Sequence, residues 1–131
     1  MSDTILIIED NEQNFYLMRF LLEKSGYTVI GAETGREGVE KALRHVPRAI
    51  LLDIQLPEMD GYAVAAELKK HKELEGMPII AVTSYAMVGD RERIMTAGAT
   101  GYIEKPINPE TFVADIARHL PRDPDSEGDI Q

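Results

Sequence analysis

Five side chains that could take part in chemistry follow short apolar runs, at points where strands would end. They are Glu9, Asp10, Asp53, Thr83 and Lys105. In an open sheet of parallel strands, the carboxyl ends of the strands share one edge, and ligands bind along that edge. Residues far apart in the sequence would therefore meet in one acidic pocket with a single lysine and a hydroxyl. A pocket of this composition suits a divalent cation and a phosphoryl group.

The acidic residues of this set predict a site for Mg²⁺. Magnesium takes oxygen ligands in near-octahedral geometry and usually keeps several waters, so a few carboxylates beside a phosphate are enough. Asp10 and Asp53 are expected to bind the ion directly, and Glu9 directly or through a water molecule. The backbone carbonyl of Gln55, in the loop after Asp53, is expected to complete the protein's ligands. Mn²⁺ is the expected substitute for Mg²⁺.

The whole set suits phosphoryl transfer, which depends mainly on positioning and on neutralisation of charge. Asp53 is suited to act as a carboxylate nucleophile that becomes an aspartyl phosphate. Lys105 would present positive charge to the equatorial oxygens of the transferred group. Thr83 would donate its hydroxyl to another phosphoryl oxygen.

Each of these residues also has an ordinary structural interpretation. Asp10 could cap the helix that follows it, and Asp53 could be a turn residue before a proline-containing loop. Thr83 could be a plain strand residue, and Lys105 a solvated charge. The occurrence of all of them in order, each at the end of an apolar run, favours the pocket.

Five apolar runs alternate with five amphipathic segments, which predicts alternating strands and helices. Strands are expected near 4–9, 27–32, 48–53, 78–83 and 100–104. Helices are expected near 11–25, 34–45, 60–72, 87–97 and 108–119. Continuously apolar strands imply burial on both faces, as parallel sheets require. With right-handed crossovers, the pattern predicts an α/β fold with a five-stranded, parallel, doubly wound sheet in a three-layer sandwich. The strand order 2-1-3-4-5 is the natural choice for five such units because it is the known order of the flavodoxin-like class, and it does not follow from the pattern itself.

Local signals support these helices. Thr34 and Glu37 form a capping-box pattern at the start of the second helix. Asn108 and Pro109 are typical of the N-cap and first residue of the fifth helix. Gly98 is placed to end the fourth helix.

Composition limits the classes of function. The 131 residues predict one domain, residues 1–120, and an acidic tail, residues 121–131, that is expected to be disordered. A formal charge of −9 argues against direct contact with nucleic acid, which requires Lys and Arg to neutralise phosphates. The absence of cysteine excludes disulfides and thiolate metal sites. No apolar run reaches the about 20 residues of a membrane span, so we expect a cytoplasmic protein without membrane insertion.

Four motifs together resemble the receiver domain of two-component response regulators. The resemblance covers about residues 4–119 and rests on Glu9-Asp10-Asn11, Asp53 within LLDIQLPEMDG, Thr83-Ser84 after PIIAV, and Tyr102-Ile-Glu-Lys105-Pro106. The fold implied is the CheY-like form of the sandwich described above. The short chain and the stretches EDNEQN and DIQLPEMDG are most similar to stand-alone receivers of the DivK type. Receivers cut from hybrid histidine kinases are similar too, and this alternative stays open.

The resemblance assigns a role to each site residue. It implies that Asp53 is the phosphoacceptor, that Glu9, Asp10, Asp53 and the Gln55 carbonyl hold Mg²⁺, and that Lys105 pairs with the phosphoryl group. The donor would be a histidine kinase or a histidine phosphotransfer protein. The output would be contact with an unidentified downstream protein through the fourth helix, fifth strand and fifth helix, roughly residues 87–119. Such a protein is not an enzyme, apart from catalysing its own Mg²⁺-dependent phosphorylation and dephosphorylation.

Four further expectations come from the resemblance alone. Thr83 would be the switch hydroxyl, and Tyr102 the aromatic switch residue that turns inward when Thr83 moves toward the phosphate. The Lys105–Pro106 peptide bond would be cis, an isomer open to it because its second residue is proline. Gln55 and Tyr85 would occupy the positions that tune dephosphorylation.

Three rival functions fit the sequence less well. A phosphohydrolase with an aspartyl nucleophile typically has a second Asp two residues later, and here that position is Gln55. An FMN carrier of the same fold needs a phosphate loop rich in Ser, Thr and Gly, whereas the loop after the first strand is Glu9-Asp10-Asn11-Glu12. A scaffold that no longer accepts phosphate would not need to keep every charged residue of the site.

Overall fold

The fold is an α/β sandwich around one parallel sheet. The computed structural model describes residues 3–56, 59–84 and 88–120. The sheet has five strands in the order β2-β1-β3-β4-β5, all parallel, which confirms the predicted topology. The strands are β1 (Thr4–Ile8), β2 (Thr28–Ala32), β3 (Ala49–Asp53), β4 (Ile79–Thr83) and β5 (Gly101–Glu104).

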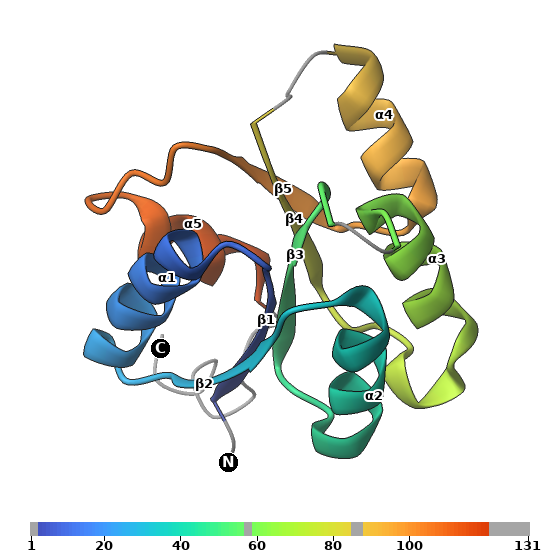
Figure 1. Ribbon diagram of the computed structural model, residues 1–131, viewed down its shortest axis with the longest axis horizontal. Helices are drawn as coiled ribbons and strands as arrows, with labels where there is room; N and C mark the ends of the chain where they lie inside the picture. The colour runs from blue at the N-terminus through green and yellow to red at the C-terminus, as the bar shows by residue number, and fades with distance from the viewer. Residues whose placement is uncertain (1–2, 57–58, 85–87, 121–131) are drawn as a thin grey trace, which may run out of the picture.

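Helices cover both faces of the sheet, as a doubly wound fold requires (Figure 1). One face carries α1 (Glu12–Lys24) and α5 (Phe112–His119). The other carries α2 (Gly35–His45), α3 (Gly61–Lys70) and α4 (Val88–Ala97), with a short 3₁₀ turn after α3. These are the three layers that the alternation of strands and helices predicted.

Alternation along the central strands divides the apolar side chains between two cores. On β1, Leu6 and Ile8 belong to the core beneath α2 and α3, and Ile5 and Ile7 belong to the core beneath α1 and α5. Every residue of β3 and of β4 is buried. This burial agrees with the continuous apolar runs, since a strand covered on both faces does not need polar positions.

The register of the strands brings the predicted site residues to one edge. Ile8 lies beside Leu52 across β1 and β3, so the residues that follow β1 are adjacent to Asp53, the last residue of β3. Thr83 ends β4 and lies beside Glu104 on β5, one residue before Lys105. Four separate parts of the chain therefore meet at the carboxyl edge of the sheet.

Side-chain caps start the three helices that follow β1, β2 and β3. Asn11 accepts a hydrogen bond from the Asn14 N–H at 2.9 Å, and Asp60 accepts one from the Ala63 N–H at 2.8 Å. Thr34 accepts one from the Glu37 N–H at 3.1 Å, as the capping pattern predicted. The Glu37 carboxylate accepts from the N–H of Glu33 at 2.8 Å, one residue before the position that a capping box uses.

The last helix starts later than expected. The Asn108 side chain accepts a hydrogen bond from the Glu110 N–H at 2.9 Å, and its carbonyl accepts from the Phe112 N–H at 2.9 Å. An Asn side chain bonded two residues ahead forms a tight turn, so Pro109 lies in that turn and α5 begins at Phe112. The prediction of Pro109 as the first helical residue was wrong.

The third helix is also shorter than its expected range of 60–72. His71 has extended backbone dihedrals of φ −89° and ψ 118°, and α3 ends at Lys70. Residues 72–74 then form the separate 3₁₀ turn. Tyr85 and the tail at 121–131 lie outside the described residues.

Candidate functional site

Three carboxylates meet where β1 and β3 end. Glu9 and Asp10 follow β1, and Asp53 is the last residue of β3. One oxygen from each lies within 4.8 Å of the others, in the single acidic cluster of metal-binding size found among the described residues. Glu9 and Asp53 are only 2% and 3% exposed, while Asp10 is exposed. The pocket therefore has two buried carboxylates and one that faces solvent.

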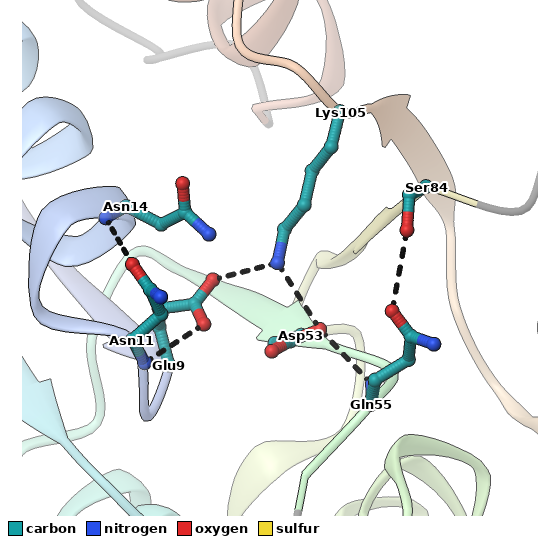
Figure 2. Close-up of polar contacts among 7 residues, drawn as sticks. All are labelled: Glu9, Asn11, Asn14, Asp53, Gln55, Ser84 and Lys105. Atoms are coloured by element: carbon teal, nitrogen blue, oxygen red, sulfur yellow. Dashed lines mark hydrogen bonds and ion pairs between the residues drawn. The ribbon is translucent and has the colours of Figure 1, made fainter.

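Lys105 places its ammonium group opposite the two buried carboxylates (Figure 2). Its Nζ lies 3.1 Å from Oε1 of Glu9 and 3.5 Å from Oδ1 of Asp53. The Lys105–Pro106 peptide bond is cis, the isomer that the resemblance implied. The backbone N–H of Lys105 donates to the Thr83 carbonyl at 2.8 Å, which ties the lysine to the end of β4.

The charge balance around Glu9 favours a cation. Burial, and then the nearby Asp53 carboxyl, raise the pKa of Glu9 to about 7, and the Asn11 N–H and then Lys105 only partly offset them. Within the described residues, Oε1 of Glu9 is buried without a hydrogen bond, although Lys105 lies close to it. A divalent cation would relieve the repulsion between the carboxylates, and this oxygen could serve as one of its ligands. These oxygen donors therefore fit Mg²⁺.

The loop after Asp53 is held against that residue by hydrogen bonds. The Gln55 N–H donates to Oδ1 of Asp53 at 3.0 Å, and the Gly61 N–H donates to the Ile54 carbonyl at 2.8 Å. The Gln55 side chain accepts a hydrogen bond from the Ser84 hydroxyl at 3.2 Å, as Figure 2 shows. The loops that follow β3 and β4 are thus joined beside Asp53.

The two predicted switch residues lie on neighbouring strands. Thr83 is 1% exposed at the end of β4. Tyr102 on β5 is half-buried and pairs with Ala81, two residues before Thr83. Its ring packs on the core beneath α2, α3 and α4, and the guanidinium of Arg91 lies 4.8 Å from the ring centroid.

The sequence alone did not predict the contacts that Ser84 and Arg91 make in this region. Ser84 belongs to the motif after PIIAV. Its position directly after the end of a strand is the same signal that predicted the other site residues, and it could have indicated that Ser84 lies beside them. Arg91 carries no such signal, because one arginine on an amphipathic helix is ordinary. Its relation to Tyr102 appears only when α4 is packed beside β5.

Comparison with known proteins gives the family. Residues 5–117 match the response regulator receiver domain. The chain belongs to this family. It is 46% identical over 120 residues to the polar-differentiation response regulator DivK of Brucella ovis, covering 92% of this chain and 98% of that one. Receiver domains interact with histidine kinases or phosphotransfer proteins, and the likeness to DivK is to a single-domain response regulator.

Solved structures agree with this fold. The chemotaxis protein CheY4 of Vibrio cholerae has a TM-score of 0.88 at 27% identity, covering 92% of this chain and all of that chain. The receiver domain of the sensor histidine kinase PA1611 of Pseudomonas aeruginosa has a TM-score of 0.83 at 34% identity, covering 91% and 98%. In that structure a magnesium ion is coordinated in the active site cleft. Among the described residues of the present chain, no helix is long and apolar enough to span a membrane.

Proposed function

We propose that Asp53 accepts a phosphoryl group from a phosphohistidine on a histidine kinase or histidine phosphotransfer protein. An oxygen of the Asp53 carboxylate forms a bond to phosphorus while the P–N bond of the phosphohistidine breaks. The released imidazole keeps the bonding electron pair and takes a proton from solvent. The observation that carries this proposal is the pairing of Asp53 and Glu9 with one ammonium group at the carboxyl edge of the sheet.

Different residues around Asp53 would position its carboxylate and neutralise the charge of the phosphoryl group. The Gln55 N–H donates to Oδ1 of Asp53, which fixes the orientation of the carboxylate. Lys105 is close enough to move its ammonium group from Glu9 to the oxygens of a phosphoryl group on Asp53. Thr83, at the end of the neighbouring strand, would donate its hydroxyl to another of these oxygens.

Glu9, Asp10, Asp53 and the backbone carbonyl of Gln55 would hold Mg²⁺, with Mn²⁺ as a substitute. When bound, the ion supplies positive charge that lowers the repulsion between Asp53 and an anionic phosphoryl donor. The cluster of three carboxylate oxygens within 4.8 Å supports this assignment. The magnesium in the related PA1611 receiver supports it as well.

Output would depend on the conformation of one face. The receiver unit would comprise residues 1–120, and the face formed by α4, β5 and α5 would contact a downstream protein. Phosphorylation would shift an equilibrium between two arrangements of this face through Thr83 and Tyr102, and the partner would bind one of them better. Gln55 and Tyr85 would set how fast the chain hydrolyses its own aspartyl phosphate. The likeness to DivK over nearly all of that chain favours a stand-alone regulator over a piece of a hybrid kinase.

Intact-mass measurement tests the function directly. The protein is incubated with Mg²⁺ and acetyl phosphate, and a gain of one phosphoryl group is expected. Asp53→Asn should abolish the gain, whereas Asp60→Asn changes the N-cap of α3, a position that Asn also suits, and should retain it. An unmodified wild-type protein that also fails to bind Mg²⁺ would contradict the proposal. Fast release of phosphate from many donor molecules, with no accumulation of phosphorylated protein, would favour a phosphohydrolase instead.

A further inference from the structure

Helix α4 is attached to the rest of the domain by few side chains. Of its side chains that the structure describes, residues 90–97, only Ile94 is buried. Two arginines add contacts on either side of it. The guanidinium of Arg93 lies 4.2 Å from the ring centroid of Tyr62 on α3, and that of Arg91 lies 4.8 Å from the ring centroid of Tyr102 on β5.

Arg91 makes a second contact with the same strand. Its Nη2 lies 3.7 Å from Oε1 of Glu104. Tyr102 and Glu104 are two residues apart, and side chains with this spacing lie on one face of a strand. A single guanidinium therefore spans both side chains and joins α4 to the end of β5, next to Lys105.

The two contacts of Arg91 differ in strength and in how they depend on the orientation of the Tyr102 ring. The ion pair with Glu104 is long and joins side chains that are 47% and 58% exposed, so it contributes little. The contact with Tyr102 depends on the ring staying beneath the guanidinium. If the ring turned into the core, Arg91 would lose this contact, whereas the contact of Arg93 is with Tyr62 on α3 and would not be affected in the same way.

We propose that Arg91 is a positioning residue that holds the Tyr102 ring in its present orientation and so opposes the phosphorylated conformation. The inference rests on the proposed function and adds a specific restraint to it. Arg91 would set the threshold for switching, because a phosphoryl group on Asp53 must supply enough free energy to overcome the contact between Arg91 and Tyr102.

Binding of BeF₃⁻, an analogue of the phosphoryl group, tests the restraint. BeF₃⁻ is titrated at saturating Mg²⁺ into wild type, Arg91→Ala, Arg93→Ala, Tyr102→Leu and the Arg91→Ala/Tyr102→Leu double variant, with binding followed by NMR. Arg91→Ala should bind BeF₃⁻ about two- to five-fold more tightly than wild type, the ratio expected for loss of one exposed cation–π contact. Arg93→Ala, which removes the matching contact to α3, should bind like wild type. The gain should vanish in the Tyr102→Leu background.

Three results would overturn the restraint. One is equal or weaker binding by Arg91→Ala than by wild type. A second is an equal gain in Arg93→Ala, which would mean that any loosening of α4 has this effect. The third is a gain that persists when Tyr102 is replaced. Failure of wild type itself to bind BeF₃⁻ would instead overturn the proposed function, and the inference with it.

Discussion

The ammonium group of Lys105 lies closer to Glu9 than to the predicted phosphoacceptor. Its Nζ is 3.1 Å from Oε1 of Glu9 and 3.5 Å from Oδ1 of Asp53. The lysine thus contacts Glu9, which a divalent cation in the pocket would also use as a ligand. A bound metal ion and Lys105 would share one carboxylate, and their positive charges would repel each other.

Replacement of Lys105 should therefore have opposite effects on metal binding and on phosphorylation. Lys105→Met should raise the affinity for Mg²⁺ at pH 8 by about tenfold, because a half-buried positive charge is removed from beside the expected ligands. It should slow phosphorylation by acetyl phosphate, since the transferred group loses its cationic partner. Calorimetry and timed intact-mass measurements give the two values.

A second lysine serves as the control. Lys41 pairs with Glu37 and with the Gly31 carbonyl, not with Asp53. Lys41→Met should leave both the Mg²⁺ affinity and the phosphorylation rate close to those of wild type. Unchanged or weaker Mg²⁺ binding by Lys105→Met would show that lysine and metal do not compete.

The raised pKa of Glu9 predicts a pH-dependent stability in the absence of metal. The folded protein keeps the Glu9 proton up to about pH 7, whereas the unfolded chain releases it near the ordinary value of 4.5. The folded state binds more protons between these values, so the free energy of unfolding falls as pH rises from about 4.5 to 7. The loss should be on the order of 3 kcal/mol at most.

Urea unfolding at a series of pH values measures this loss. Glu9→Gln should lack this component, and the difference between the two proteins isolates the contribution of Glu9. Mg²⁺ should reverse the trend, because the ion binds the deprotonated carboxylate and its affinity should increase up to about pH 7. A constant difference between wild type and Glu9→Gln across this range would contradict the prediction.

Gly61 should tolerate no side chain, because it packs on the backbone that follows Asp53. A Cβ at this position would lie 2.4 Å from the Ile54 Cα and 3.0 Å from the Asp53 carbonyl oxygen. Gly61→Ala should lower the free energy of unfolding by about 2 kcal/mol and slow phosphorylation, since the acceptor's backbone must shift. Chemical denaturation and the acetyl phosphate assay measure the two effects.

Gly35 is a matched control for this substitution. Like Gly61, it is the first residue of a helix and follows a capping residue. A Cβ there would lie 2.4 Å from the Cγ2 of Val64, a side-chain atom and not backbone. Gly35→Ala should leave the phosphorylation rate unchanged, and an equal loss of rate in both variants would argue against a backbone effect at Asp53.

Val46 stores strain at the end of α2. It has φ 42° and ψ 68°, the left-handed region that a β-branched residue rarely adopts. Val46→Gly should raise the free energy of unfolding by about 1 kcal/mol, after allowance for the greater freedom of glycine in the unfolded chain. Val46→Ala, which keeps a Cβ, should gain less. A lower thermal midpoint for Val46→Gly than for wild type would refute this account.

The five strands and the position of the pocket were predictable because each strand carries its own signal, whereas the strand order came from the fold class. The continuous apolar runs ending at Ile8 and Asp53 indicate burial on both faces, and parallel strands place their ends together. The side-chain bonds of Asn108 were not predictable in the same way. Both a helix cap and a tight turn begin with Asn before Pro, and only packing against the rest of the domain decides between them.

Contacts between separate elements were also beyond the sequence. The bond between Ser84 and Gln55, and the position of Arg91 over Tyr102, depend on side chains from two elements reaching one place. Neither pair has a spacing in the chain that predicts contact. The sequence therefore predicted the residues of the site better than it predicted the contacts between the elements around the site.

The order of the strands along the chain also determines when the carboxylates of the pocket can pair with the ammonium group of Lys105 during synthesis. The acids of the pocket, up to Asp53, leave the ribosome well before β5 and Lys105. A partial domain would carry the carboxylates without their counter-charge, and their repulsion would oppose closure of that edge. Lys105, which supplies the missing ammonium group, directly follows the last strand, at the margin of the sheet. Docking of the final strand and partial neutralisation of the pocket would thus occur together during folding.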